Sequence, residues 1–288
     1  ITLGFGSRAS KKMLLPIKHM TKTIRAISIN VLEKRINVST SHDELKQLAE
    51  TFNEMLDRLQ TSYEMQNQFV SDASHELRTP IAVIQGYANL LYRWGKDDKE
   101  VLAESITAIK SESYNMQQLV EKLLFLARSD KKTQKIYKEY FCANELINEL
   151  IKETKLIDSN HQISSDLNEK LSIYADKNLL KQALRIFIDN SIKYTPIGGT
   201  IKLNSYIKKS SLTIEIIDTG IGIAKNDLPH IFTRFYRCDK SRSKESGGTG
   251  LGLSISKWII SKHNGSILVE SKPEMGTKIT IGLPLGKK

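Results

Sequence analysis

The chain has 288 residues, of which 40% are hydrophobic and 26% are charged, and its formal net charge is +11. This length and composition predict roughly two domains, or three small ones, with ordinary hydrophobic cores. No stretch approaches the ~20 consecutive apolar residues of a membrane-spanning helix. The two cysteines, Cys142 and Cys238, are far apart and lack metal-ligand spacing, so neither is expected to be functional and a reducing compartment is indicated.

The positive charge is compatible with three anionic partners: nucleic acid, a membrane surface or a phosphorylated ligand. The basic residues are scattered and form no groove-reading motif, so no nucleic-acid partner is expected. A basic surface beside a membrane is the simpler explanation. Residues 6–12 suit the cytoplasmic flank of a span that ends upstream. Because the chain opens on Ile1 rather than methionine, we expect a fragment of a longer protein.

Two amphipathic helices are predicted at the N-terminal end. Pro16 is placed as a helix-starting proline, and after it Ile17, Met20, Ile24 and Ile27 repeat at three- and four-residue steps. Asp43 and Glu44 open the second helix, in which Leu45, Leu48, Phe52, Met55 and Leu59 repeat in the same way. Such short helices cannot bury their apolar seams alone, so a dimeric four-helix bundle is predicted.

The next helix presents one histidine to solvent. Its apolar face consists of Phe69, Ala73, Leu77, Ile81 and Ile84, and His75 points away from that face. Thr79 lies one turn beyond His75, and Pro80 predicts a bend because it lacks a backbone N–H. The helix is expected to end near Trp94. Residues 95–98 break the pattern, and a long second helix follows with apolar positions from Val101 to Leu126.

From residue 136 the pattern changes to mixed helix and strand. Strands are predicted at residues 200–203, 212–217, 266–269 and 277–281. A helical run between Asp176 and Pro196 contains Asn190 and Lys193. An asparagine amide oxygen suits the oxygen shell of Mg²⁺ without adding charge, and a lysine offsets phosphate charge.

Two glycine-containing segments complete the candidate site. Asp218 ends a predicted strand and is followed by Gly220 and Gly222; a carboxylate accepts hydrogen bonds from an exocyclic amine, and glycines let backbone approach a ring. Residues 246–256 form a glycine-rich loop that leads into a helix. The backbone N–H groups of the loop and the positive end of the helix should face phosphates. The polar segment before it, residues 238–245, suits a flexible lid. Neither a Walker-type motif nor a Rossmann context is present.

These motifs resemble those of sensor histidine kinases. Ser74-His75-Glu76-Leu77-Arg78-Thr79-Pro80 resembles the phosphoacceptor box. The segments 187–196, 216–223, 231–237 and 246–256 resemble, in the family's order, the N, G1, F and glycine-rich boxes of its ATP-binding domain. Phe52-Asn53-Glu54-Met55 resembles a HAMP linker, which passes signals from membrane helices to kinase domains. Essentially the whole chain is covered.

The resemblance implies a multidomain fold. All-α HAMP and phosphotransfer regions, each a dimeric four-helix bundle, would precede an α/β-sandwich ATP-binding domain of the Bergerat type. The expected divisions are a juxtamembrane remnant at 1–13, the HAMP linker and signalling helix at 14–65, the dimerisation and phosphotransfer domain at 66–130, and the catalytic domain at 136–288.

The resemblance also implies a reaction: Mg·ATP-dependent phosphorylation of His75, followed by transfer to an aspartate of a response regulator. Glu76 would hold the ring proton, and Thr79 would serve the reverse phosphatase activity. Asn190 would bind Mg²⁺. The residues implied to bind ATP are Asn190, Lys193, Tyr194, Asp218, Gly220, Gly222, Arg237, Gly248, Thr249, Gly250, Leu251 and Gly252. A homodimer, linked to a bacterial cell membrane through a missing upstream region and otherwise cytoplasmic, is implied as well.

Two other functions share these motifs. ATPases of the same superfamily, such as gyrases and chaperones, carry a water-activating glutamate four residues before the magnesium asparagine. That position is Ile186 here, which cannot act as a base; many sensor kinases carry an asparagine there. A nucleotide-binding scaffold without transfer is disfavoured because His75, Glu76 and Asn190 are all present. The stimulus, the cognate regulator and transfer within or between subunits stay open.

Overall fold

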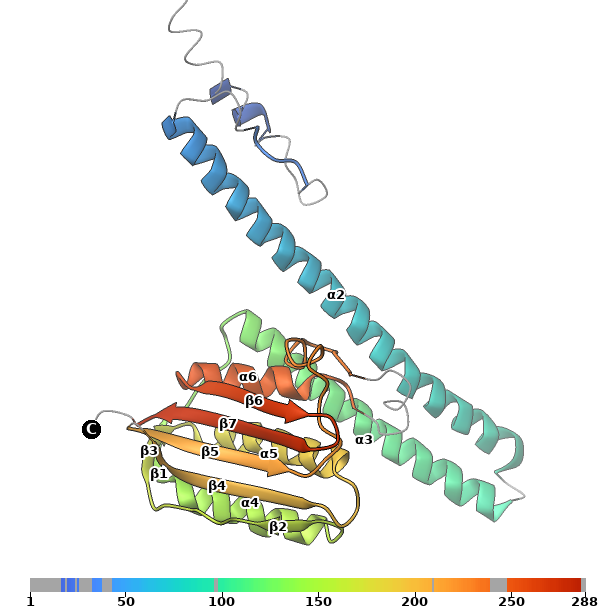
Figure 1. Ribbon diagram of the computed structural model, residues 1–288. Helices are drawn as coiled ribbons and strands as arrows, with labels where there is room; N and C mark the ends of the chain where they lie inside the picture. The colour runs from blue at the N-terminus through green and yellow to red at the C-terminus, as the bar shows by residue number, and fades with distance from the viewer. Residues whose placement is uncertain are drawn as a thin grey trace, which may run out of the picture. The chain divides into compact units, whose positions relative to one another are not determined.

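The computed structural model describes residues 17–18, 20–23, 25, 33–37, 43–95, 98–208, 210–238 and 248–285. The chain divides into two compact units, residues 1–75 and 76–288. Helix α2 (Asp43–Trp94) crosses the division, and α3 (Lys99–Asp130) follows it (Figure 1). Each unit is described by itself.

In the first unit, a short extended segment packs beside α2. Met20, Ile36 and Ala49 form a small core with Phe52. The side-chain amide of Asn53 binds both backbone groups of Ile36: its Oδ1 accepts from the Ile36 N–H at 2.9 Å and its Nδ2 donates to the Ile36 carbonyl at 3.0 Å. The Asn53 amide therefore holds the segment against the helix.

The predicted apolar seam of α2 is only partly buried. Leu48, Met55 and Leu59 are half or more exposed, whereas Ala49 and Leu56 are buried. Within the described part of the chain, α2 therefore packs through positions next to the predicted seam. Ile24 and Ile27, predicted to face this seam, lie outside the described residues.

Helices α2 and α3 agree with the predicted hairpin. Helix α2 continues through Pro80 and ends at Trp94, as predicted, since the lost hydrogen bond at Pro80 does not stop the helix. The expected boundary at residue 65 lies within α2 and is not marked by a break. Helix α3 starts where Asp98, through its side chain, accepts from the N–H groups of Glu100 and Val101.

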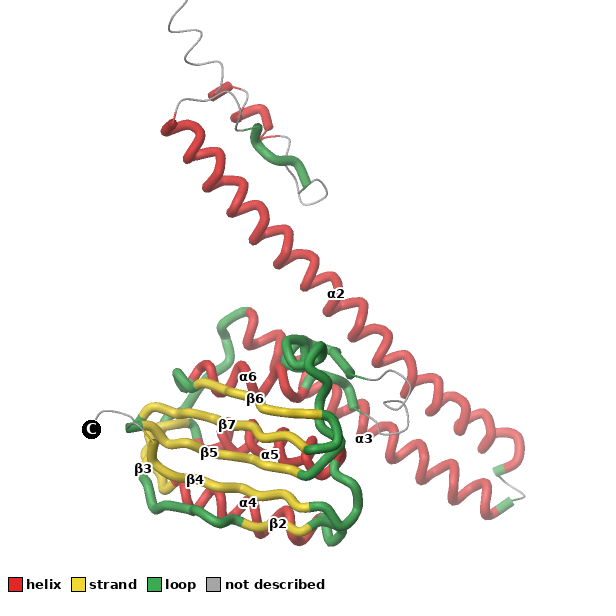
Figure 2. The backbone as a smooth tube through the Cα atoms, in the orientation of Figure 1, coloured by secondary structure: helices red, strands yellow, loops and turns green. Residues whose placement is uncertain are grey.

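The remainder of the second unit is a two-layer α/β sandwich (Figure 2). Its five-stranded sheet has the order β2-β4-β5-β7-β6. The strands are β2 (Gln162–Ser164), β4 (Thr200–Lys208), β5 (Ser211–Asp218), β6 (Ser266–Lys272) and β7 (Gly276–Pro284). Strand β2 pairs parallel with β4, and the other pairs are antiparallel. The four strands predicted from sequence are β4, β5, β6 and β7.

Three helices cover one face of this sheet: α4 (Ala143–Ile157), α5 (Lys177–Tyr194) and α6 (Gly252–Lys262) (Figure 1). Phe187 of α5 and Ile216 of β5 are fully buried between the layers. A separate two-stranded sheet pairs β1 (Glu139–Cys142) with β3 (Ser172–Ala175). The strands β1 and β3 were not predicted, because each has only four residues. Helix α4 was also missed, although its buried Leu146, Ile147 and Leu150 follow a helical period.

Helix α3 also contacts the sandwich. The ring of Phe125 meets the edge of Trp258, with centroids 5.2 Å apart. Arg234 donates to both carboxylate oxygens of Asp130, at 2.8 and 2.6 Å. This contact joins the end of α3 to α6 and to the segment that precedes the glycine-rich loop.

Candidate active site

His75 lies on α2 with its side chain exposed, as predicted. Glu76 is half-buried and Thr79 is exposed on the same helix. Within the described part of the chain the imidazole of His75 has no hydrogen-bond partner, so both ring nitrogens remain available. A neutral imidazole nitrogen is a competent nucleophile near neutral pH. His75 can therefore accept a group delivered from outside the helix.

Asp218, at the end of β5, is the most tightly fixed acidic group of the candidate site. Its Oδ1 accepts from the backbone N–H groups of Gly220 at 3.0 Å and Thr277 at 3.1 Å. Its Oδ2 accepts from the hydroxyl of Ser191 at 2.9 Å. The pairing of β5 with β7 places Asp218 opposite Thr277. Three donors hold the carboxylate, so its free lone pairs are preset for a ligand amine.

The loop after Asp218 needs its glycines. Gly222 has φ +69°, and a Cβ there would lie 2.0 Å from the carbonyl oxygen of Lys272. A Cβ on Gly220 would meet the carbonyl oxygen of Tyr194 at 2.7 Å. This close approach joins the loop to the end of α5, where the Ile221 N–H donates to the same Tyr194 oxygen at 3.1 Å.

Cationic groups gather between α5 and the glycine-rich loop. The Nζ of Lys193 lies 2.6 Å from where a Cβ on Gly248 would stand, and 5.1 Å from the centroid of the Tyr194 ring. Burial, then the charges of Arg237 and Lys122, lower the pKa of Lys193. Burial raises the pKa of Tyr194, while Arg237 opposes that shift. This concentration of positive charge is suited to a polyphosphate.

Lys122 of α3 was not expected in this neighbourhood. Its charge also affects the pKa of Asp189. Burial raises the pKa of Asp189 above its ordinary value, and the charges of Arg185 and Lys122 offset part of that rise. In the sequence Lys122 is one of many polar residues on a long helix, and no local signal distinguishes it. Ser191 was also missed, although it lies inside a recognised motif.

The glycine-rich loop leads into α6 as predicted. Gly250 has φ +67°, and a Cβ there would lie 2.6 Å from the carbonyl carbon of Phe235; the Phe235 N–H donates to the Gly250 carbonyl at 3.0 Å. No side chain among the described residues caps the N-terminus of α6, so its N–H groups can face an anion. Leu251 is fully buried, hence only its backbone can reach a ligand. Thr249 is half-buried. Most of the predicted lid, residues 239–245, is not among the residues that the structure describes.

The Asn190 amide oxygen can serve as one protein ligand of a magnesium ion that a polyphosphate also binds. Asn190 is half-buried near the end of α5, and within the described chain its amide has no hydrogen-bond partner. Those residues also contain no cluster of three or more His, Cys, Asp or Glu side chains that could hold a metal. Mg²⁺ commonly keeps waters and phosphate oxygens beside one or two protein ligands.

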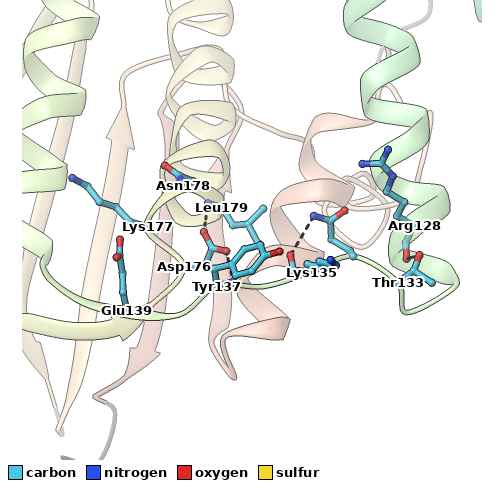
Figure 3. Close-up of a pocket in the computed structure, with 10 residues that line it drawn as sticks. Arg128, Thr133, Lys135, Tyr137, Glu139, Asp176, Lys177, Asn178 and Leu179 are labelled. Carbon is cyan, nitrogen blue, oxygen red and sulfur yellow. Dashed lines mark hydrogen bonds between the residues drawn. The ribbon is translucent and has the colours of Figure 1, made fainter.

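A cavity lies elsewhere in the second unit, at the opposite end of α5. It has a volume of about 770 Å³, and Figure 3 shows Asp176, Lys177 and Leu179 of its lining at the start of α5. Asn190 lies at the other end of that helix. The two carboxylate oxygens of Asp176 accept hydrogen bonds there from the N–H groups of Tyr137 and Leu179. The cavity includes none of the predicted nucleotide residues.

Family models account for most of the chain. The HAMP domain model matches residues 8–61, the His Kinase A (phospho-acceptor) domain model matches 65–132, and the histidine kinase-, DNA gyrase B- and HSP90-like ATPase model matches 175–287. The chain belongs to the sensor histidine kinases of two-component systems. This membership also accounts for the order of helical regions and α/β sandwich in this kinase.

Two curated relatives of the kinase carry the same name. It is 37% identical over 282 residues to the signal transduction histidine-protein kinase ArlS of Staphylococcus haemolyticus, covering 98% of this chain and 62% of the relative. It is 39% identical over 273 residues to ArlS of Staphylococcus aureus, covering 94% and 60%. The chain thus spans about three fifths of these relatives' length. None of its described helices is long and apolar enough to cross a membrane.

Solved structures resemble the kinase too. The Acinetobacter baumannii histidine kinase AdeS matches at 26% identity with a TM-score of 0.58, covering 74% of this chain and 98% of that one. Histidine kinase ThkA, solved in complex with response regulator protein TrrA, matches at 25% identity with a TM-score of 0.62, covering 86% and 68%.

Proposed function

We propose that this kinase transfers the γ-phosphoryl group of ATP to His75 and then to an aspartate of a response regulator. The observation that carries the proposal is the arrangement around α5. A carboxylate held by three donors, Asp218, lies beside a cationic cluster and an uncapped helix N-terminus. Incubation with [γ-³²P]ATP should give an acid-labile, base-stable phosphoprotein.

ATP is bound across this arrangement. The Asp218 carboxylate accepts from the adenine amino group, while Gly220 and Gly222 let the backbone approach the ring. Lys193 and Arg237 neutralise phosphate charge. Backbone N–H groups of Gly248, Gly250 and Gly252, with those of Thr249 and Leu251, donate to phosphate oxygens. Tyr194 packs beside Lys193 and covers the ligand.

Asn190 would hold a magnesium ion through its amide oxygen. When bound, Mg²⁺ supplies charge neutralisation on the phosphates. Ile186, one turn earlier, lies against Gly252 and provides no base to activate water. This observation disfavours a simple ATPase, for which free phosphate and no phosphoprotein would be the products.

The transfer uses His75 as nucleophile. Its unprotonated ring nitrogen attacks the γ-phosphorus, the N–P bond forms, and the bond to the β–γ bridging oxygen breaks as ADP leaves. The proton on the other ring nitrogen passes to Glu76, adjacent in α2. In-line positioning and charge neutralisation provide most of the acceleration.

The partners follow from the same proposal. The phosphorylated histidine serves a receiver domain, as the TrrA complex of ThkA suggests. The exposed Leu48, Met55 and Leu59 of α2 suit a second copy of the chain, which would complete HAMP and phosphotransfer four-helix bundles. We place residues 14–65, 66–130 and 136–288 in three functional domains, on the cytoplasmic side of a membrane-anchored protein.

Replacing Asn190 by Ala should lower the rate of autophosphorylation about 100-fold, because a metal ion stabilises several kcal/mol of developing charge in such transfers. Raising the Mg²⁺ concentration should restore part of the rate. Asn178→Ala is the matched control, since Asn178 is exposed at the other end of α5; it should behave as the wild type. Equal rates in both variants would contradict the metal role.

Replacing Thr79 by Ala should reduce dephosphorylation of the phosphorylated response regulator about tenfold, since one oriented water is lost. Autophosphorylation should change less than about twofold, because Thr79 takes no part in the proposed attack on the γ-phosphorus. Thr107→Ala, at an exposed position of α3, is the control. Parallel loss of both activities in a Thr79→Ala protein that still binds nucleotide would contradict a role specific to dephosphorylation.

A further inference from the structure

A buried histidine outside the proposed active site lies between two hydrogen-bond acceptors. The Nδ1 of His161 is 2.6 Å from Oδ2 of Asp158, and its Nε2 is 2.9 Å from the backbone carbonyl oxygen of Thr195. The side chains of His161 and Asp158 are only 5% and 7% exposed. Asp158 also accepts from the Asn160 N–H at 2.9 Å through its other oxygen.

Opposite an ionised Asp158 carboxylate, this geometry is satisfied only by a doubly protonated ring. A carboxylate and a carbonyl can only accept, so each ring nitrogen must carry a hydrogen. His263 provides the contrast, because its Nε2 accepts from the Asp176 N–H while its Nδ1 donates to the Ile259 carbonyl. His263 is therefore satisfied as a neutral ring, whereas His161 is satisfied only as an imidazolium.

The titration behaviour of the two rings agrees with their partners. Burial alone would lower the pKa of His161, but the carbonyl of Thr195 and the carboxylate of Asp158 outweigh it, and the pKa lies above its ordinary value. Burial lowers the pKa of His263. The groups that act on His161 are the Asp158 carboxylate at the end of α4 and the Thr195 and Pro196 carbonyls after α5.

The hydrogen bonds of His161 connect the end of α4 to the end of α5, which lies beside the proposed nucleotide site. Thr195 is the C-cap of α5, the helix that carries Asn190 and Lys193. Its neighbour Tyr194 offers its carbonyl oxygen to the Ile221 N–H of the loop after Asp218. A second hydrogen bond connects the same two segments, since the Gly198 N–H donates to the Asn160 carbonyl at 2.8 Å. Hydrogen bonds thereby connect the end of α4 to the end of α5, and the end of α5 to the loop after Asp218.

We infer that His161 is a positioning residue for nucleotide binding: its imidazolium holds the turn after α5 against the end of α4, and loss of its proton loosens Tyr194 and the Asp218 loop. The inference rests on the proposed ATP site. Because the charged ring makes the bridge, nucleotide affinity is full below the ordinary histidine range and falls as pH rises through the value of the folded protein.

The experiment measures two quantities on the 288-residue chain between pH 5.5 and 9. NMR titration of the histidine ring signals, with His161 assigned by its absence in His161→Gln, gives the protonation state. Calorimetry with Mg·AMPPNP gives the dissociation constant. His161→Gln should bind about tenfold more weakly at pH 7, since a charged hydrogen bond is lost, and should lack the pH-dependent step.

Asp158→Asn keeps the hydrogen bond to Asn160 but removes the carboxylate. Both the His161 titration and the step in nucleotide affinity should move together to lower pH. This joint shift separates His161 from Lys193, whose titration Asp158→Asn leaves unchanged. His263→Gln is the matched control: it should lower thermal stability while the affinity step stays in place.

A His161 ring that is neutral at pH 7 overturns the inference, as does an affinity step that stays fixed in Asp158→Asn while the ring titration moves. Wild-type protein that fails to bind Mg·AMPPNP at any pH instead overturns the proposed ATP site, and the ring titration is still readable in that case.

Discussion

His75→Gln should abolish the acid-labile ³²P label while leaving nucleotide binding unchanged. Glutamine keeps the size and polarity of the side chain, yet its amide nitrogen is not a nucleophile, so no N–P bond can form. His75 is exposed on α2, hence the substitution should not affect folding. The measurement is autoradiography after incubation with [γ-³²P]ATP, and the loss should exceed about 1,000-fold because no other step replaces the nucleophile.

His230→Gln is the matched control for this result. His230 is also exposed and lies in the catalytic region, where its side chain makes a ring contact with Tyr236, so its variant should label like the wild type. An acid-labile label that persists in His75→Gln would identify another acceptor. If the label disappears together with Mg·AMPPNP binding, the variant has lost its fold and a second substitution, His75→Ala, would be needed to decide between the two.

Asp218→Asn should weaken ATP binding about 100-fold with little loss of stability. The amide oxygen can still accept from Gly220 and Thr277, and the amide nitrogen can donate to the Ser191 hydroxyl, which rotates to accept. The adenine amino group, however, would then lose its acceptor. Sites built to bind a ligand N–H reject mismatched partners strongly, because a buried polar group stays unpaired.

Calorimetry with ATP and with GTP measures this effect. The preference for ATP should fall in Asp218→Asn, whereas thermal unfolding should change little. Asp166→Asn is the control, since Asp166 is exposed and pairs with Lys202 at the sheet edge; it should bind ATP normally. Unchanged ATP affinity in Asp218→Asn would rule out the role of this carboxylate in adenine recognition.

Much of the fold could be predicted because its signals are local. The four strands from β4 to β7 are short apolar runs bounded by turn residues, and the break between α2 and α3 follows from glycine and aspartate at 95–98. The β1–β3 pair and β2 were missed, because three or four residues carry too little periodicity. Their pairing depends on residues distant in the sequence.

The candidate site divides in the same way. The positions of Asn190, Asp218 and Gly250 could be predicted, since each has a residue type and spacing tied to a chemical role. The donors that orient Asp218 could not, because Thr277 reaches it only through the pairing of β5 with β7. Likewise, the charge of Lys122 lowers the pKa of Lys193 only because α3 packs against the sandwich.

The sequence alone determined the family, the order of the helical regions and the α/β sandwich, and the residues proposed for transfer and nucleotide binding. These properties depend on residue type, short-range spacing and order along the chain. The tertiary structure decided which groups lie against one another: three donors on Asp218, an ion pair between Asp130 and Arg234, and the His161 ring between Asp158 and Thr195. Hydrogen bonds and charges act over a few ångströms in space, so partners far apart in the sequence are identified only once the chain has folded.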